Sequence, residues 1–253
     1  MKFDISKIEV SRNDIRRCIS IPETITEELA EFLGAFVGDG HLGLHSGRYG
    51  KNTYTHYEIN MSGNIEEKDY LDYINNRFNS LFNIRMYYLK QGNNKSILIK
   101  IDSKGILHFL NKICDIPLNF KTDSVRIPFI IKNSNIRMKS AFLRGLFDTD
   151  FSLSFKNKNF RGYTYPVIKG SFASKTLIED LEEFFRDLSF KSNVIYNLKE
   201  YDKRFNKYYI KHAIYLNGKD NLKKWIYYIG SSNKKFQRKI AKWQESGSCE
   251  PRY

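Results

Sequence analysis

Two aspartates occupy the same place in two similar stretches of the sequence, and they are the residues best suited to do chemistry. The stretches are Phe32–Gly40 and Leu143–Phe151. Asp39 is the eighth residue of the first, and Asp150, 111 positions later, is the eighth residue of the second. Two carboxylates brought together repel each other unless a cation joins them, and hard oxygen ligands favour Mg²⁺. The pair therefore predicts a shared divalent metal site.

Small residues recur every four positions before each aspartate, and this spacing says how the two could be brought together. They are Ala30, Gly34 and Gly38 in the first copy and Ala141, Gly145 and Thr149 in the second. Residues so spaced lie along one stripe of a helix, and small ones let two helix backbones approach closely. Two such helices, packed together, would place Asp39 and Asp150 side by side at their C-terminal ends, where the helix dipoles are negative.

The segments after the two motifs follow one order, so the chain reads as a tandem repeat. Each half is expected to be an αββαββα unit of the α+β class. In the first repeat we expect strands near 42–44, 57–61, 84–89 and 97–101 and helices over 65–81 and 106–113, after a motif helix that starts at a Thr24–Glu27 capping box. In the second repeat we expect strands near 151–156, 165–172, 194–199 and 208–216 and helices over 176–188 and 222–229. The limits are a basic lead-in 1–25, repeats 26–132 and 133–245, and a tail 246–253.

The composition favours a polyanion as partner. The 253 residues include 42 Lys and Arg against 28 Asp and Glu, a net charge of +14. The sequence contains no run of 18 apolar residues and no signal peptide, so neither a membrane partner nor secretion is expected. The three cysteines are widely scattered, which predicts neither disulfides nor a zinc site, and a cytoplasmic (nucleoid-associated) or organellar setting fits best. The histidines His41, His45 and His56 lack a repeated ligand spacing and are taken as polar strand residues.

The two stretches resemble the paired LAGLIDADG motifs of the homing endonucleases, in the single-chain form with two motifs. Both follow the nine positions of that motif, with the acidic eighth residue present twice. Val37 replaces the frequent aspartate at the sixth position of the first copy, and Phe151 replaces the closing glycine of the second. The resemblance implies a pseudo-twofold monomer in which two antiparallel β-sheets form a DNA-binding saddle around a central pair of packed motif helices.

The resemblance also implies further site residues. The backbone carbonyls before the two aspartates, at Gly38 and Thr149, would join them as ligands of two or three Mg²⁺ ions, for which Mn²⁺ could substitute. Family members place a basic residue beside each metal site. The matching positions are Lys121 and Lys235, which follow the two aspartates by 82 and 85 residues, and the nearest alternatives are Arg126 and Lys234. A lysine there could stabilise phosphate charge or orient the attacking water.

Exposed faces of the strands are the expected DNA-reading surface, since a two-stranded ribbon fits the major groove, where base edges are distinguishable. The candidates are His56, Glu58, Asn60, Lys100, Ser152, Ser154, Lys156, Lys199 and Lys211. Because these positions differ between the repeats, the preferred site should be long and not palindromic.

The sequence thus predicts a site-specific, Mg²⁺-dependent endonuclease that cuts double-stranded DNA. No nucleophilic Cys or Ser begins the chain and no His-Asn pair ends it, so we expect a free-standing or intron-encoded protein rather than a complete intein. Two alternatives stay open. One is an RNA-binding maturase that assists intron splicing, and the other is a catalytically inactive DNA-binding protein of the same fold.

Overall fold

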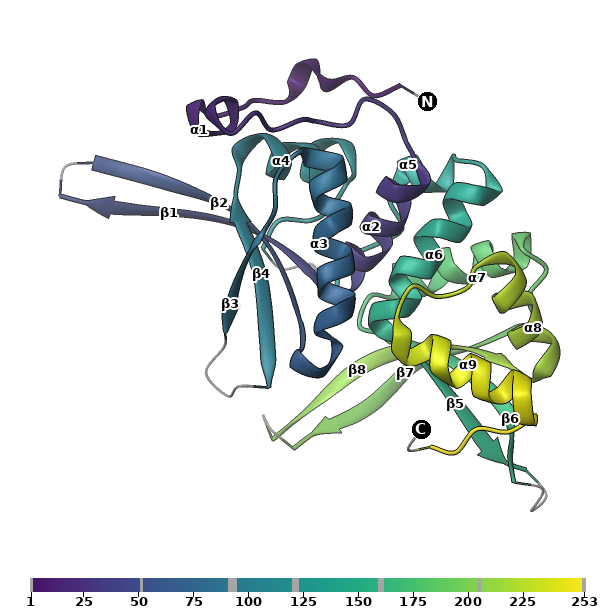
Figure 1. The fold of residues 1–253 in the computed structure, drawn as a ribbon. Helices are drawn as coiled ribbons and strands as arrows, with labels where there is room; N and C mark the ends of the chain where they lie inside the picture. The colour runs from purple at the N-terminus through teal and green to yellow at the C-terminus, as the bar shows by residue number, and fades with distance from the viewer. Residues whose placement is uncertain are drawn as a thin grey trace. The chain divides into compact units, whose positions relative to one another are not determined.

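The computed structural model describes residues 2–50, 52–90, 95–119, 123–158, 162–203 and 206–251, which form two compact units (Figure 1). The first unit comprises Met1–Lys121 and Pro128–Gly145, and the second comprises Thr122–Ile127 and Leu146–Tyr253. Helix α6, Ile136–Asp150, begins in the first unit and ends in the second.

The first unit is built on a four-stranded antiparallel sheet with the strand order β1-β2-β4-β3. Its strands are β1 (Gly40–Tyr49), β2 (Asn52–Asn64), β3 (Tyr87–Lys90) and β4 (Ser96–Asp102). Its helices are α1 (Arg12–Arg16), α2 (Glu27–Asp39), α3 (Lys68–Phe82), α4 (Lys104–His108) and α5 (Phe129–Lys132), together with the start of α6. One π-helical turn, Phe109–Ile113, follows α4.

The second unit repeats this arrangement with the strand order β5-β6-β8-β7. Its strands are β5 (Phe151–Asn157), β6 (Tyr163–Phe172), β7 (Ser192–Asp202) and β8 (Lys207–Asn217). Its helices are α7 (Lys175–Asp187), α8 (Lys219–Tyr228) and α9 (Lys234–Ser246), together with the end of α6. The two sheets have the same connectivity, so the predicted α+β tandem repeat is confirmed.

Each sheet buries one face under helices and leaves the other open. In the first unit, the alternating residues Ile97, Ile99 and Ile101 of β4 are buried on the side covered by α3, where Ile74 and Phe78 are fully buried. Each such side chain contributes roughly 1.5–3 kcal/mol to folding. In the second unit β5 alternates in the same way, with hydrophobic residues buried and polar residues exposed. The open faces are therefore the polar faces of both sheets.

Several element limits differ from the sequence predictions. The N-cap of α2 is Thr26 and not Thr24, because the Thr26 side chain accepts a hydrogen bond from the Leu29 amide. Thr24 instead forms an isolated antiparallel β-bridge with Lys2. Strand β1 continues through residues 46–49, beyond the strand predicted near 42–44. Helices α1, α5 and α9 were not predicted. Helices α1 and α5 have only five and four residues, whereas α9 has an apolar stripe of Phe236, Ile240 and Trp243 that the sequence reasoning missed. Within the described chain, no helix combines the length and the apolar character needed to span a membrane.

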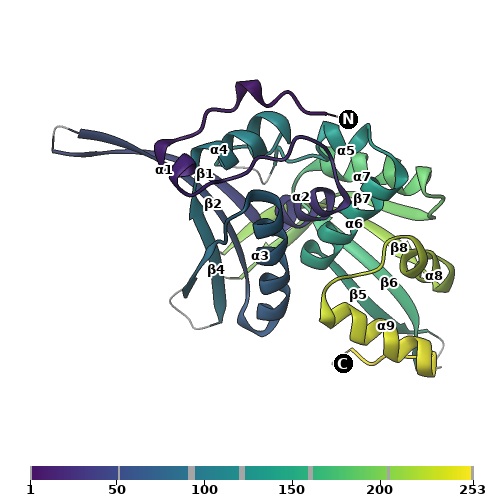
Figure 2. The same ribbon diagram turned by 45° about the horizontal axis from the view of Figure 1, so that its top comes forward.

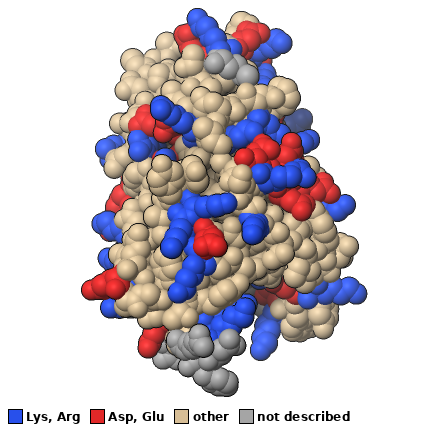
Figure 3. Space-filling view, turned by 90° about the vertical axis from the view of Figure 1, so that its right-hand side faces the viewer, with Lys and Arg blue, Asp and Glu red and all other residues tan. Residues whose placement is uncertain are grey.

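The charge is not gathered in one patch on the face that Figure 3 shows. Lys and Arg side chains lie dispersed over this face and are interleaved with Asp and Glu. This face alone therefore does not show a single basic surface.

Candidate active site and nucleic-acid interface

Helix α2 and the first part of α6 touch backbone to backbone inside the first unit. A Cβ atom placed on Gly145 would lie 2.0 Å from the carbonyl oxygen of Glu31 and 2.7 Å from the amide nitrogen of Ala35. No side chain fits into that space, so this approach requires glycine. The close helix contact expected from the stripe of small residues is present at this point.

A buried ion pair beside this contact was missed by the sequence reasoning. Glu31 is 1% exposed, and its carboxylate accepts hydrogen bonds from Arg144 Nε at 3.0 Å and from the Tyr73 hydroxyl at 3.0 Å. A carboxylate buried without such donors would be strongly destabilising. The available signal was a charge of opposite sign in the middle of each motif helix, directly beside the stripe of small residues.

Asp39 and Asp150 each end a motif helix. Asp39 is the last residue of α2 and is half-buried, and Asp150 is the last residue of α6 and is exposed. Neither helix has a basic residue in its last turn, so the helix itself does not neutralise its carboxylate or the negative end of its dipole. Carboxylates in this setting fit a divalent cation, because they are hard oxygen ligands at a negative pole.

Side-chain ligands alone do not complete a metal site in the part of the chain that the structure describes. No group of three or more His, Cys, Asp and Glu residues there could hold a metal ion. A metal bound by the two aspartates would therefore need further oxygen atoms from the backbone or from water. Gly38 and Thr149, the residues whose carbonyls the resemblance implies, are both half-buried at their helix ends.

Asp148 fastens the end of α6 to the loop before α9, inside the second unit. Its side chain is 2% exposed and accepts hydrogen bonds from the Ser231 hydroxyl, from the Ser232 amide at 2.7 Å and from the Asn233 amide at 3.1 Å. In return, Asn233 Nδ2 donates to the Asp148 carbonyl oxygen at 3.2 Å. This set of hydrogen bonds, which we call the Asp148 clasp, fixes the start of α9 against the helix that ends in Asp150.

The corresponding loop of the first unit is held differently. Position 37, which matches Asp148, is a buried valine. The loop is attached to β1 instead: the Asn119 amide donates to the Leu42 carbonyl at 2.7 Å, and Asn119 Oδ1 accepts from the Leu44 amide at 3.1 Å. The first repeat therefore fastens this loop to a strand, and the second fastens it to the motif helix.

Phe151 does not disturb the path of the backbone after Asp150. In both repeats the helix passes directly into the first strand of the sheet, at Gly40 and at Phe151. The cross-strand partner of Gly40 is Met61, and that of Phe151 is Gly170. A Cβ atom on Gly170 would lie 2.7 Å from the Phe151 ring. The large and small residues have thus changed places across the strand pair.

On the open face of the first sheet, the predicted DNA-reading residues lie together. Asn60 pairs with Lys100 across the strands, and Glu58 pairs with Asp102. Glu58 accepts hydrogen bonds from Lys100 Nζ at 2.6 Å and from Asn60 Nδ2 at 2.5 Å. Burial alone would raise the pKa of Glu58, but these two donors outweigh it and lower the pKa. His56 is exposed and lies 3.5 Å from the Asp102 carboxylate.

On the second sheet the predicted residues do not all share one face. Ser152, Ser154 and Lys156 alternate along β5 on the exposed side. Lys211 lies opposite Leu198, whereas Lys199 lies opposite Ile210, so the two lysines point to opposite faces of the β7–β8 ribbon.

Lys199 is exposed but lies on the face opposite to that of Lys211, and its role in DNA reading stays a prediction. The reason for the opposite placement is an irregularity between Ile195 and Leu198, where Asn197 has a positive φ of 57° and reverses the alternation of β7. Lys169 lies opposite Ser152 and was missed, although its position in a predicted strand was a signal.

The predicted basic residues occupy different surroundings. Lys121 lies outside the described residues. Lys234 and Lys235 are the first residues of α9 and are exposed. Arg126 Nη2 lies 3.5 Å from Asp180 of α7, so it helps to attach residues 123–127 to that helix and does not lie on a strand face.

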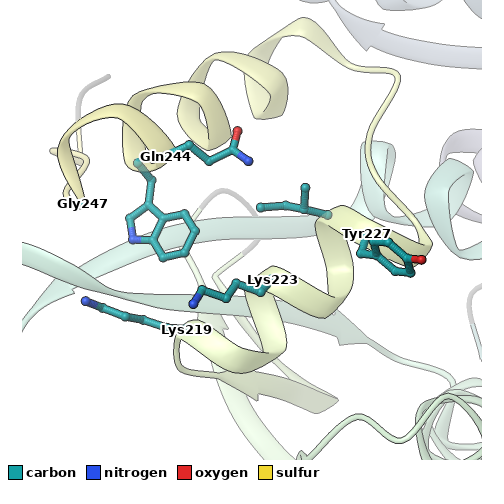
Figure 4. A pocket seen from close by; sticks show the side chains of 7 residues that line it. Lys219, Lys223, Tyr227, Gln244 and Gly247 are labelled. Carbon is teal, nitrogen blue, oxygen red and sulfur yellow. The ribbon is translucent and has the colours of Figure 1, made fainter.

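A groove of about 660 Å³ between α8 and α9 is a different kind of site (Figure 4). It is lined by Lys219, Lys223, Ile226, Tyr227, Trp243, Gln244 and Gly247. None of these side chains is a carboxylate or an imidazole, so the groove lacks the ligands that a catalytic metal site usually has.

Comparisons with known proteins give the following relatives. No protein-family model matches the chain. It is 30% identical over 215 residues to the replication factor C small subunit of Methanocaldococcus jannaschii, and 26% identical over 215 residues to the tRNA-splicing ligase RtcB of Methanopyrus kandleri. These alignments take in 85% and 80% of this chain but only 10% and 20% of the relatives. The chain thus spans a fifth or less of the curated relatives that it matches.

Solved structures match over the greater part of both chains. I-GzeII, a LAGLIDADG homing endonuclease in complex with its DNA target, aligns with a TM-score of 0.58 at 14% identity over 88% of this chain and 90% of its own. The meganuclease I-SmaMI bound to uncleavable DNA gives 0.57 at 12% identity over 88% and 91%. Mesophilic variants of I-DmoI give 0.56 at 15% identity over 87% and 97%. This chain, with two sheets of equal connectivity and two motif helices that each end in aspartate, has the fold of the LAGLIDADG homing endonucleases.

Proposed function

We propose that this protein is a DNA endonuclease that hydrolyses phosphodiesters of both strands with Mg²⁺, at a long and non-palindromic site. The observation that carries the proposal is the backbone contact of the two motif helices at Gly145, with an aspartate at the end of each helix. The fold adds support, because I-GzeII and I-SmaMI have it and are bound to DNA. The chain matches only 10% of the replication factor C small subunit and 20% of the tRNA-splicing ligase RtcB, so the activities of those proteins are not transferred to it.

Asp39 and Asp150 are the proposed metal ligands. Asp39 lies four residues beyond Ala35, and Asp150 lies five residues beyond Gly145, the two residues that meet at the helix contact. Each carboxylate thus lies about one helical turn along its own helix from that residue, and we propose that the two aspartates share the metal. Gly38 and Thr149 would add backbone carbonyl oxygens, for two or three ions in all, and Mn²⁺ could take the place of Mg²⁺.

When bound, the metal would lower the pKa of a water and stabilise the charge on the phosphate in the transition state. The aspartates would hold the metal in place and thereby orient the scissile phosphates, one for each strand. Lys235 would place an ammonium group beside the second phosphate, where it stabilises negative charge. The Asp148 clasp would fix the start of α9 and thereby the position of Lys235. Lys121 is the proposed counterpart in the first repeat.

Specificity would come from the open faces of the sheets. The first face carries His56, Glu58, Asn60 and Lys100, and the second carries Ser152, Ser154, Lys156, Lys169 and Lys211. Side chains that differ so much read different base edges, and the half-sites should therefore differ.

The test is a selection from a randomised duplex library in Mg²⁺, where cutting is possible, and in Ca²⁺, where we expect binding only. The selected duplex should then be cut by the wild type but not by Asp39→Asn or Asp150→Asn, with binding retained. Asp220→Asn, which removes an exposed carboxylate of α8, is the matched control and should cut normally.

Each other outcome points to an alternative function. Binding without cutting in every metal would indicate a DNA-binding protein without catalysis. Tight binding of structured RNA with no preference for DNA would indicate a maturase. Cutting that survives both aspartate substitutions would exclude the proposed site.

A further inference from the structure

The N-terminal segment is a docked part of the first unit, as Figure 2 shows where it runs over α4. Phe3 is 7% exposed and packs against Phe109, with ring centroids 5.8 Å apart. Asp14 of α1 is 1% exposed and accepts hydrogen bonds from the Ser103 hydroxyl at 2.8 Å and the Gly105 amide at 3.1 Å. Burial alone would raise the pKa of Asp14, but these bonds and those from Ser11 lower it. The segment is therefore held in one place.

This docking forms a cavity of about 480 Å³ at one edge of the first sheet. It is lined by Asn13, Arg16 and Arg17 of the segment, by Tyr87 of β3 and by Asp102 of β4. Tyr87 lies opposite Lys100, and Asp102 lies opposite Glu58. The cavity is thus continuous with the open face that carries the proposed base-reading residues.

The two arginines of the cavity have different surroundings. Arg17 Nη2 donates to the Asp102 carbonyl at 2.7 Å and lies 3.8 Å from the Asp14 carboxylate, so it braces the segment against β4. Arg16 is exposed, and its Nη2 donates to the neutral Asn13 Oδ1 at 2.6 Å. Within the described residues no carboxylate pairs with Arg16. The only acidic side chain of the cavity, Asp102, faces His56 at 3.5 Å.

We infer that Arg16, with the Asn13 amide and the Tyr87 hydroxyl, binds a backbone phosphate of the DNA just outside the bases read by the first sheet. The inference rests on the proposed function and extends it, because it adds a phosphate contact from a segment outside both repeats. A guanidinium, an amide and a phenol all donate hydrogen bonds, and a phosphate accepts them. Tyr87 is 48% exposed, so its hydroxyl is accessible. The contact positions the duplex and reads no base.

The test compares Arg16→Ala with Arg12→Ala on the duplex selected above, with affinity measured in Ca²⁺ over a range of salt concentrations. Arg12 is an exposed arginine of the same short helix that does not line the cavity, so its removal changes the charge equally. We expect Arg16→Ala to weaken binding about threefold to tenfold and to lower the salt slope by about one, with a smaller change for Arg12→Ala.

Trimmed duplexes make the test specific for position. Removing base pairs from the end next to the first unit should weaken wild-type binding, and the same trimming should then have no effect on Arg16→Ala. Equal losses for Arg16→Ala and Arg12→Ala, or a full response of Arg16→Ala to trimming, would overturn the inference. Failure of the wild type to bind any duplex would instead overturn the proposed function, so the two failures are distinguishable.

Discussion

The two repeats share one chain path but fill it with different residues, and the clearest differences lie at the sixth and ninth motif positions. At the ninth, the small and large partners are Gly40 and Met61 in one repeat and are reversed as Phe151 and Gly170 in the other. In each repeat the pair thus combines one small and one large residue. At the sixth position, Asp148 has a polar role that a buried valine replaces in the first repeat. The comparison shows that the packing is symmetric, whereas the loops before the proposed catalytic lysines are held asymmetrically.

The largest loss of stability is expected from substitution of Phe151, at the ninth motif position of the second repeat. Phe151 is 5% exposed, and its ring lies 5.7 Å from that of Phe172 and 6.2 Å from that of Trp225. Phe151→Ala should lower the free energy of unfolding by about 3–5 kcal/mol, measured by urea denaturation. Adding Gly170→Met rebuilds the arrangement of the first repeat and should recover part of the loss. A double variant no more stable than Phe151→Ala would contradict the volume exchange.

The next largest loss of stability is expected from removal of the Asp148 clasp. Asp148→Val copies the sixth residue of the first repeat and removes the carboxylate that accepts hydrogen bonds from Ser231, Ser232 and Asn233. The cost should be about 2–4 kcal/mol in unfolding free energy. Cutting should fall more on the strand served by Asp150 and Lys235 than on the other strand, as end-labelled duplexes would show. Equal losses on both strands would mean that the clasp stabilises the fold without positioning α9.

Asn119 provides the matching change in the first repeat. Asn119→Ala removes the acceptor for the Leu44 amide, and since Leu44 is 38% exposed, water can replace that bond. We expect a loss of only about 0.5–1 kcal/mol. A loss as large as that of Asp148→Val would show that the two loops are equally dependent on their anchors.

The sequence was sufficient for the parts of the fold that rest on periodicity. The small residues of the motif helices and the alternation of β4 and β5 predicted the helix contact and both sheets. It was not sufficient where a single residue changes the geometry. The bulge at Asn197 places Lys199 on the opposite face of the ribbon, and no local sequence pattern predicts that bulge. Asp148 could not be interpreted from the sequence, because its partners lie more than 80 positions away and meet it only in the folded second unit.

The smallest expected effect concerns a Glu–Lys pair in each sheet. Lys100 lies 2.6 Å from Glu58, with side chains 22% and 19% exposed, and Lys211 lies 2.7 Å from Glu200, with side chains 39% and 43% exposed. In both pairs the pKa of the glutamate is lowered. The stabilisation is therefore present above the ordinary glutamate pKa and is lost as the pH falls through the lowered value. Because solvent screens the more exposed pair, Glu58→Gln should flatten the acid limb of the stability curve more than Glu200→Gln does, by about 1 kcal/mol or less. An equal change in both variants would mean that exposure does not distinguish the pairs, and the two sheets would then be electrostatically alike despite their different side chains.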